Sequence, residues 1–335
     1  MDVVPRGGDA GGRRREPVTL ALPATGPIVA GRAPPEAAPV GRARLWGMSA
    51  GFWFVAPALA IITLFFLLPV AAALALSLTD FDIYALAHWR NLRFVGLANY
   101  IEVLSSERFW TALVNTLYFV LVGGPLSVAV SLGAALLLES RLTRWKTLWR
   151  TIFFAPVVTT LVASAVVWRY LYHTEYGLIN QSLGWIGVGP IDWMGDPRWS
   201  MPAIIVLGVW KNFGYNMVIF MAGLTAIPAE LYEAARVDGA SAWHRFRYVT
   251  LPQLAPTFLF VSVTTMIGYF QLFAEPYVMT RGGPEDSTYS LVMFMYEEGF
   301  RWWRLGTASA IAVILFLITL AAAAGQVWLG RRSAL

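Results

Sequence analysis

Six long apolar stretches follow one another along this chain and restrict what it can fold into. They cover residues 50–78, 111–138, 150–172, 201–225, 254–279 and 305–329. Each is long enough to cross about 30 Å of hydrocarbon as a helix of about 20 residues, and a helix satisfies its own backbone polar groups in lipid. Because the chain is 57% hydrophobic and only 13% charged, a soluble globule could not bury them all. We therefore predict an all-α membrane protein with six transmembrane helices.

The first 45 residues differ in composition from the rest. They are rich in Gly, Pro, Ala and Arg, include the run Arg13-Arg14-Arg15 and hold almost no large apolar side chains. Such a segment cannot bury enough surface to offset its ordering entropy. Residues 1–45 are therefore predicted to be a disordered basic tail, and residues 46–335 a single transmembrane domain.

The placement of basic residues predicts the orientation of the chain. Segments on the cytoplasmic side of membrane proteins carry an excess of Lys and Arg. The tail and residues 139–150, 226–253 and 330–335 hold most of the basic residues, whereas acidic residues outnumber basic ones in the opposite loops. Both termini are therefore expected in the cytoplasm. The same sorting by membrane side explains the net charge of +5 without nucleic-acid binding, which we do not expect.

The cytoplasmic segment 228–252 is predicted to form a short helix–turn–helix. Pro228 suits the first turn of a helix, and Gly239 can take the left-handed conformation that ends one. Ser241 can then cap a second short helix. Such a loop could set an amphipathic helix into a groove of a partner, or it could lie passively on the lipid surface. The residues alone leave both alternatives open.

The sequence of this loop resembles the Glu-Ala-Ala loop of permeases in binding-protein-dependent ABC importers. That pattern is Glu-Ala-Ala, three residues, Gly, and then a hydrophobic–x–Leu-Pro ending, matched here by Glu233, Ala234, Ala235, Gly239, Val249, Leu251 and Pro252. The resemblance implies a permease domain with a type I ABC importer-like fold, whose loop is a coupling helix in a cleft of a separate ATPase. It assigns ATPase coupling to Glu233, Ala234, Ala235, Asp238, Gly239, Leu251 and Pro252.

Other segments resemble the carbohydrate branch of that family, of the maltose and glycerol-phosphate type. They include Phe94–Tyr100, Asn115–Leu117, Gly177–Asn180 and Gly282–Pro284. The resemblance implies a subunit of the bacterial cytoplasmic (inner) membrane that translocates a sugar, oligosaccharide, polyol or glycerol phosphate by alternating access. The implied partners are a second permease chain, two ATP-binding subunits and a periplasmic or lipid-anchored substrate-binding protein. A non-sugar solute is the alternative.

No motif for catalysis, nucleotide binding or metal binding emerges from the sequence. The only lysines, Lys146 and Lys211, each follow a tryptophan, so neither completes a Gly-x-x-x-x-Gly-Lys-Ser/Thr loop. We expect no cofactor in this chain, with ATP and Mg bound by the partner ATPase, and no catalytic or metal-binding residue. Residues 47–51 match Gly-x-Ser-x-Gly by letter around Ser49, which leaves a membrane-embedded enzyme as a remote alternative, although that motif needs a preceding strand. A passive channel would have no use for a docking loop.

Polar residues inside the fourth and fifth apolar stretches mark a candidate substrate path. Polar side chains within spans are costly and usually face a cavity or a partner helix. Both stretches flank the Glu-Ala-Ala loop, and the resemblance to maltose-type relatives places sugar contacts on the same two helices. On a continuous helix Asn212, Tyr215 and Asn216 would share one face, at i, i+3 and i+4, and so would Gly268, Gln271 and Glu275, at i, i+3 and i+7. The predicted substrate-lining residues are Asn212, Tyr215, Asn216, Tyr269, Gln271 and Glu275. The alternative is hydrogen bonding between helices, and Lys211 could pair with an acid or snorkel towards the interface.

Overall fold

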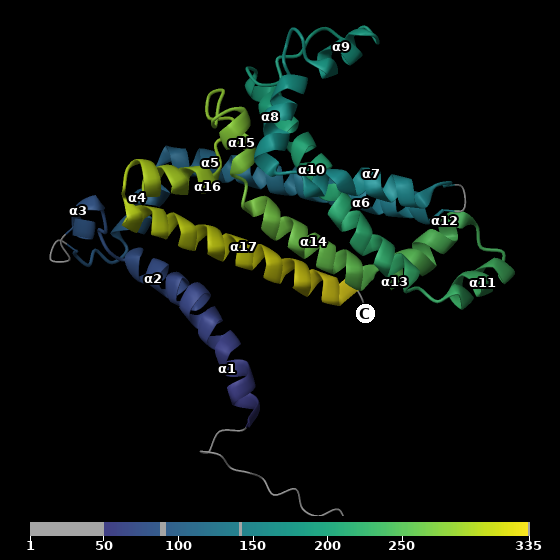
Figure 1. The fold of residues 1–335 in the computed structure, drawn as a ribbon, viewed down its shortest axis with the longest axis horizontal. Helices are drawn as coiled ribbons and strands as arrows, with labels where there is room; N and C mark the ends of the chain where they lie inside the picture. The colour runs from purple at the N-terminus through teal and green to yellow at the C-terminus, as the bar shows by residue number, and fades with distance from the viewer. Residues whose placement is uncertain (1–49, 88–91, 141–142, 334–335) are drawn as a thin grey trace, which may run out of the picture. The chain divides into compact units, whose positions relative to one another are not determined.

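The chain is almost entirely helical in the computed structural model, which describes residues 50–87, 92–140 and 143–333 (Figure 1). The helices are α1 (Ala50–Ile62), α2 (Leu68–Leu76), α3 (Ile83–Ala87), α4 (Ala98–Ser105), α5 (Glu107–Tyr118), α6 (Gly124–Glu139), α7 (Lys146–Val158), α8 (Leu161–Leu171), α9 (Leu178–Gly184), α10 (Pro197–Thr225), α11 (Ala229–Val237), α12 (Ala242–Arg245), α13 (Leu251–Gln253), α14 (Ala255–Phe270), α15 (Ala274–Met279), α16 (Leu291–Tyr296) and α17 (Leu305–Ser333). Short π-helical segments lie at Thr63–Leu67, Phe119–Gly123, Phe246–Thr250 and Glu297–Arg301. Within the described residues the only extended pairing is an isolated bridge between Thr79 and Phe94, so the all-α prediction is confirmed.

The chain divides into two compact units, Met1–Pro57 and Ala58–Leu335. Of the first unit, only residues 50–57 at the start of α1 are described. The predicted disordered tail over residues 1–45 and the Gly-x-Ser-x-Gly serine, Ser49, lie outside the described residues.

Length and composition allow four helical runs to cross a membrane unbroken, and six spans if two bent pairs are each counted as one. The four are Gly51–Leu76, Glu107–Glu139, Pro197–Thr225 and Leu305–Gly330. The bent pairs are α7 with α8, at 102°, and the run Ala242–Gln253 with α14, at 67°. These numbers apply to the described part of the chain, and six is also the number of predicted stretches. The first bent pair falls in the predicted stretch 150–172, whereas the second takes in residues 242–253, which were predicted to belong to the cytoplasmic loop.

The predicted stretch 150–172 is broken into α7 and α8. Pro156 lies in the last turn of α7, where its missing N–H removes one hydrogen bond of the helix. Thr159 and Thr160 are extended, with ψ of 152° and 142°, and the Thr160 hydroxyl caps α8 by accepting from the Ala163 N–H at 3.4 Å. The chain therefore starts a new helix in a new direction.

The predicted stretch 254–279 also differs from one continuous helix. Helix α14 ends at Phe270, the chain is non-helical over Gln271–Phe273, and α15 begins at Ala274. The backbone of Phe273, at φ −145° and ψ −60°, lies outside the helical region. The sequence spacing predicted that Gln271 and Glu275 share one helical face. This prediction is wrong, because the helix ends between them and a new one begins.

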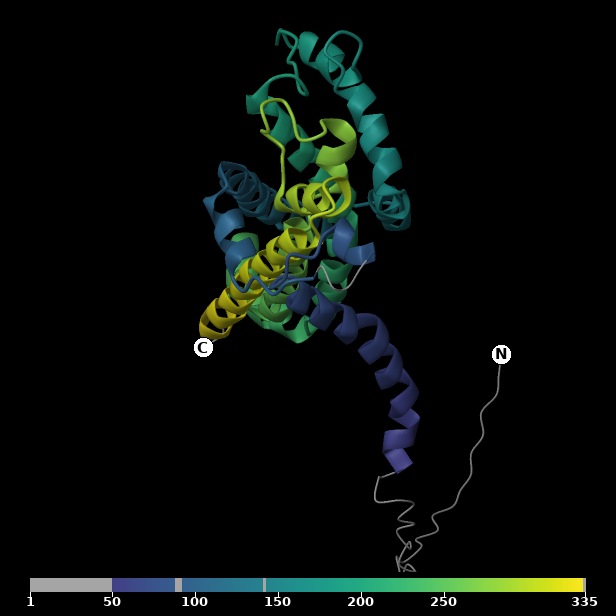
Figure 2. The same ribbon diagram turned by 90° about the vertical axis from the view of Figure 1, so that its left-hand side faces the viewer.

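Helix α10 is the central element of the second unit. It packs against α6, α7 and α14, and α17 lies along α14, as Figures 1 and 2 both show. Glycines allow the closest approaches: a Cβ added at Gly214 would lie 2.1 Å from the Phe153 carbonyl oxygen, and one at Gly208 would lie 3.1 Å from the Phe119 ring. Small residues at crossings are how membrane helices pack closely. This packing holds α10 close to α7 and to the π-helical segment Phe119–Gly123.

Candidate functional site

The first arm of the segment 228–252 is helix α11, which ends in a Schellman motif. Gly239 has φ +75°, the left-handed conformation in which a Cβ is disfavoured. Its N–H donates to the Arg236 carbonyl at 3.1 Å, and the Ala240 N–H donates to the Ala235 carbonyl at 2.9 Å. These are the two bonds that define this helix ending. The turn predicted at Gly239 is therefore present.

The second arm begins at Ser241 and is tied back to the first. The Ser241 hydroxyl accepts from the His244 N–H at 3.3 Å and so caps α12, as predicted. The Arg245 guanidinium donates to the Ala240 carbonyl at 2.7 Å. The Tyr232 and Thr250 hydroxyls, one on each arm, are 3.0 Å apart. These bonds make the loop a defined two-helix unit.

The predicted coupling residues lie on the surface of this unit. Glu233, Ala234, Asp238, Gly239 and Pro252 are exposed, and Ala235 and Leu251 are half-buried. No described residue forms an ion pair or a hydrogen bond with the Glu233 carboxylate. On the same unit Val237 is 89% exposed and Trp243 is 67% exposed. The loop thus presents a small-residue helix, an unpaired carboxylate and large apolar side chains on a single element.

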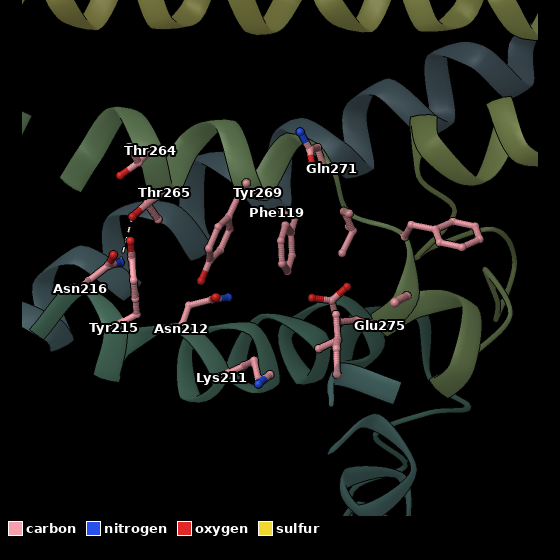
Figure 3. Close-up of a pocket in the computed structure, with 15 residues that line it drawn as sticks. Phe119, Lys211, Asn212, Tyr215, Asn216, Thr264, Thr265, Tyr269, Gln271 and Glu275 are labelled. Carbon is pink, nitrogen blue, oxygen red and sulfur yellow. Dashed lines mark hydrogen bonds between the residues drawn. The ribbon is translucent and has the colours of Figure 1, made fainter. Parts of the chain in front are cut away.

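A second feature is a cavity of about 530 Å³ between α10, α14 and the start of α15 (Figure 3). All six predicted substrate-lining residues border it: Asn212, Tyr215, Asn216, Tyr269, Gln271 and Glu275. The structure therefore brings these six side chains together around one space. Sequence reasoning missed other lining residues, among them Phe119, Thr264 and Thr265. Phe119 comes from the second span, and nothing in its local sequence sets it apart from a core phenylalanine.

Tyr269 forms an aromatic wall of the cavity. Its ring stacks on Phe119 with centroids 4.8 Å apart and planes 24° apart. Its hydroxyl is buried and faces Ser127 and Asn212 without either one reaching hydrogen-bonding geometry. A buried hydroxyl without a partner is uncommon in folded proteins. The Tyr269 hydroxyl is therefore a buried polar group that no described residue satisfies.

The two predicted asparagines of α10 differ in their bonding. Asn216 is buried, and its amide donates to the Thr265 hydroxyl at 2.9 Å. This is the bond between helices that we named as the alternative. Asn212 is exposed to the cavity and donates only to the Gly208 carbonyl of its own helix, at 2.9 Å. Its side-chain oxygen has no partner among the described residues.

Among the described residues, no acid forms an ion pair with Lys211. Its ammonium lies at the C-terminal end of α7 and donates to three carbonyls, those of Pro156 at 2.5 Å, Val157 at 3.1 Å and Thr159 at 2.6 Å. The last carbonyls of a helix have no partner within it. Lys211 therefore donates hydrogen bonds to carbonyls at the end of α7 that have no partner within the helix.

The remaining predicted residues present free polar groups to the cavity. Tyr215 is 53% exposed, and Gln271 is also exposed. Glu275 lies in the first turn of α15 and is only 9% exposed. Figure 3 shows its carboxylate directed into the cavity, facing Asn212. Aromatic faces, neutral amides and hydroxyls, and one carboxylate thus surround the same space.

A comparison with protein families identifies the class of this chain. Residues 40–334 match the model of the binding-protein-dependent transport system inner membrane component. The chain belongs to this family. It is therefore a multi-pass component of the inner membrane, and the resemblance to ABC importer permeases is confirmed.

Curated relatives support the same assignment. The lactose transport system permease protein LacF of Rhizobium radiobacter is 36% identical over 274 residues, which cover 81% of this chain and 89% of that protein. The trehalose/maltose transport system permease protein MalF of Thermococcus litoralis is 34% identical over 270 residues, covering 81% and 90%. These relatives are named permeases, so the prediction of a transport subunit, and not an enzyme, is confirmed.

A solved structure supports the fold. One chain in the crystal structure of a bacterial alginate ABC transporter, solved in complex with an alginate pentasaccharide-bound periplasmic protein, superposes with a TM-score of 0.72 at 22% identity, covering 87% of this chain and 98% of that one. At this identity the likeness shows the fold alone. The predicted type I importer-like permease fold is confirmed, and as a binding-protein-dependent permease the chain works with a substrate-binding protein.

Proposed function

We propose that this permease carries a carbohydrate across the inner membrane and that the cavity between α10 and α14 lies on its path. Support comes from relatives named for lactose, trehalose/maltose and arabinooligosaccharide transport. The cavity itself suits such a solute, because a sugar needs flat apolar faces beside neutral hydrogen-bonding groups. Tyr215, Tyr269 and Gln271 supply both. The side-chain oxygen of Asn212 adds a further acceptor.

The observation that carries the mechanism is the exposed two-helix loop. The Glu233 carboxylate on α11 forms no ion pair or hydrogen bond with any described residue, although the loop around it is held by the Tyr232–Thr250 and Arg245–Ala240 hydrogen bonds. A surface that is ordered yet unpaired is suited to a partner groove. We assign this groove to an ATP-binding subunit, which binds the ATP and Mg, and place the loop and both termini in the cytoplasm.

The rest of the assembly follows from the same proposal. A second permease chain completes the path, two ATP-binding subunits dock below, and a periplasmic or lipid-anchored binding protein delivers the solute. Closure of the ATP-binding subunits would displace α11, and the spans would rock around a site near the membrane midplane.

The proposal is tested by reversing the charge on the loop. In cells whose own copy of the gene is replaced, Glu233→Lys is expected to lower uptake of ¹⁴C-labelled lactose, maltose or trehalose to background, because the reversed charge opposes docking. Gly239→Asp is expected to do the same, since it strains the left-handed turn by roughly 1–2 kcal/mol. The amount of chain in the membrane, measured by immunoblot, should not change.

Glu175→Lys is the matched control. Glu175 is an exposed acid outside the loop, so the same charge change there should leave uptake near wild type. Normal uptake by both Glu233→Lys and Gly239→Asp would refute the coupling assignment. If the wild-type transporter takes up none of the three sugars, the carbohydrate assignment is refuted for these solutes.

A further inference from the structure

Two charged residues line the cavity, Lys211 and Glu275. Their surroundings differ. An ammonium offers three N–H donors and no acceptor, and all three donors of Lys211 can be assigned to the carbonyls of Pro156, Val157 and Thr159. The C-terminal end of a helix also carries a partial negative charge, which offsets part of the positive charge. Lys211 therefore has no free donor for a solute.

Glu275 is in the opposite situation. Its side chain is nine-tenths buried, and among the described residues only its own backbone N–H approaches the carboxylate. The basic residues of the helices packed against α15 are Arg169 on α8 and Arg198 and Lys211 on α10. None of them forms an ion pair with it. Glu275 is thus an unpaired acid aimed into the cavity (Figure 3).

An unpaired buried carboxylate needs an explanation. Removing an ionised acid from water without a partner is costly. The groups around Glu275 do not satisfy it: the Tyr269 hydroxyl lacks a hydrogen-bond partner, and Asn212 turns its amide donor to Gly208. The partner that is missing from the protein is best supplied by the solute.

We propose that Glu275 accepts hydrogen bonds from solute hydroxyls and makes the cavity selective for neutral or cationic hydroxyl-rich solutes over anionic ones. Carboxylate oxygens accept from two hydroxyls at once, and such charge-assisted bonds are strong. An anionic sugar, such as a uronate or a sugar phosphate, would meet repulsion from Glu275 and find no free cationic donor. A charge that would be left unpaired or repelled in a complex lowers the affinity for the wrong ligand. The inference rests on the proposed function and narrows its substrate class, excluding glycerol phosphate.

The absence of cysteine from this chain allows a direct test of the charge in the cavity. Gly268 lines the cavity, and a Cβ placed there meets nothing within 4 Å. In membranes that contain the whole transporter, Gly268→Cys is labelled with a cationic trimethylammonium-ethyl and an anionic sulfonatoethyl methanethiosulfonate. The measured quantity is the ratio of the cationic to the anionic labelling rate, divided by the same ratio for a free thiol in solution.

Removing the charge of Glu275 should lower this ratio. In the Gly268→Cys background, Glu275→Gln is expected to reduce it about fivefold, the size expected for one unit charge acting across a hydrated cavity. Glu275→Asp keeps the charge and should keep the ratio high, which separates charge from packing. Glu175→Gln removes an exposed acid outside the cavity and should change the ratio by less than about twofold, as distant exposed charges are screened.

An unchanged ratio in Glu275→Gln, or an equal fall in Glu275→Asp and Glu275→Gln, would overturn the inference. Its failure can be told apart from failure of the proposed function. Loss of uptake in Glu233→Lys with an unresponsive labelling ratio would refute only the role of Glu275. Normal uptake in Glu233→Lys with a fivefold fall in the ratio would refute the coupling assignment and leave the charge of the cavity established.

Discussion

Replacing Lys211 tests how the break between α7 and α8 is stabilised. Lys211→Met keeps the length and apolar stem of the side chain but removes the donors to the carbonyls of Pro156, Val157 and Thr159. A buried carbonyl that loses its donor costs about 1–3 kcal/mol. Because Lys211 is only half-buried and borders a cavity, water can replace part of each bond, and we take the lower value for each carbonyl. The expected loss of unfolding free energy is about 3 kcal/mol.

The chain contains a matched control for this change. Lys146, the only other lysine, donates one exposed hydrogen bond of 3.2 Å to the Glu139 carbonyl. Lys146→Met should therefore change stability by less than about 0.5 kcal/mol. By thermal unfolding of the purified transporter, Lys211→Met should lower the midpoint several times as far as Lys146→Met, because the midpoint shift follows the loss of unfolding free energy. Equal shifts for the two variants would refute the reasoning.

Three further changes test the packing of α10 and the polar lining of the cavity. Gly214→Ala would place a Cβ 2.1 Å from the Phe153 carbonyl oxygen, so we expect it to separate α7 from α10. The yield of folded chain, measured by size-exclusion chromatography, should fall several-fold. Gly133→Ala is the control, because a Cβ at that position meets nothing within 4 Å. Gln271→Ala should change the concentration of sugar that half-saturates uptake. Asn216→Ala loses a hydrogen bond between helices worth about 0.6–2 kcal/mol, so it should lower stability and leave that concentration unchanged. The reverse pattern in these two would exchange their assigned roles.

The loop is the part of the candidate site that the sequence predicted most completely, because its geometry is set by local rules. Gly239 ends α11 since only a left-handed residue closes the two Schellman bonds, and Ser241 caps α12 through a bond to the third residue after it. Both interactions span five residues or fewer. No knowledge of the tertiary fold is needed to place them.

The cavity was predicted in part and for a partly wrong reason. Periodicity put Asn212 and Tyr215 on one face of α10, and they do line the cavity. Gln271 and Glu275 were aligned on the assumption of one continuous helix, yet the chain leaves the helix after Phe270. They reach the cavity because the non-helical segment turns back towards α10. Such a break depends on tertiary contacts, which cannot be predicted from the spacing of residues in one sequence.

Lys211 could not have been understood from its neighbours in the sequence. Its three acceptors lie 52 to 55 residues earlier, at a helix end whose position was itself missed. The same is true of Phe119, which reaches the stack on Tyr269 from another span. In both cases packing between distant elements brings the interacting groups together, and the local sequence does not indicate these contacts.

The structure also indicates how the loop and the cavity could be linked. The α10 face that carries Asn216 lies nine residues before Thr225, or about 14 Å along the helix, and the loop begins shortly after that. The second arm of the loop leads through α13 into α14, the opposite wall. Because the Tyr232–Thr250 bond joins the two arms, a displacement of α11 must either break that bond or move both arms together. A force applied at Glu233 would therefore reach both walls that hold the cavity between them, while the Lys211 bonds to the end of α7 would make the broken third span follow α10.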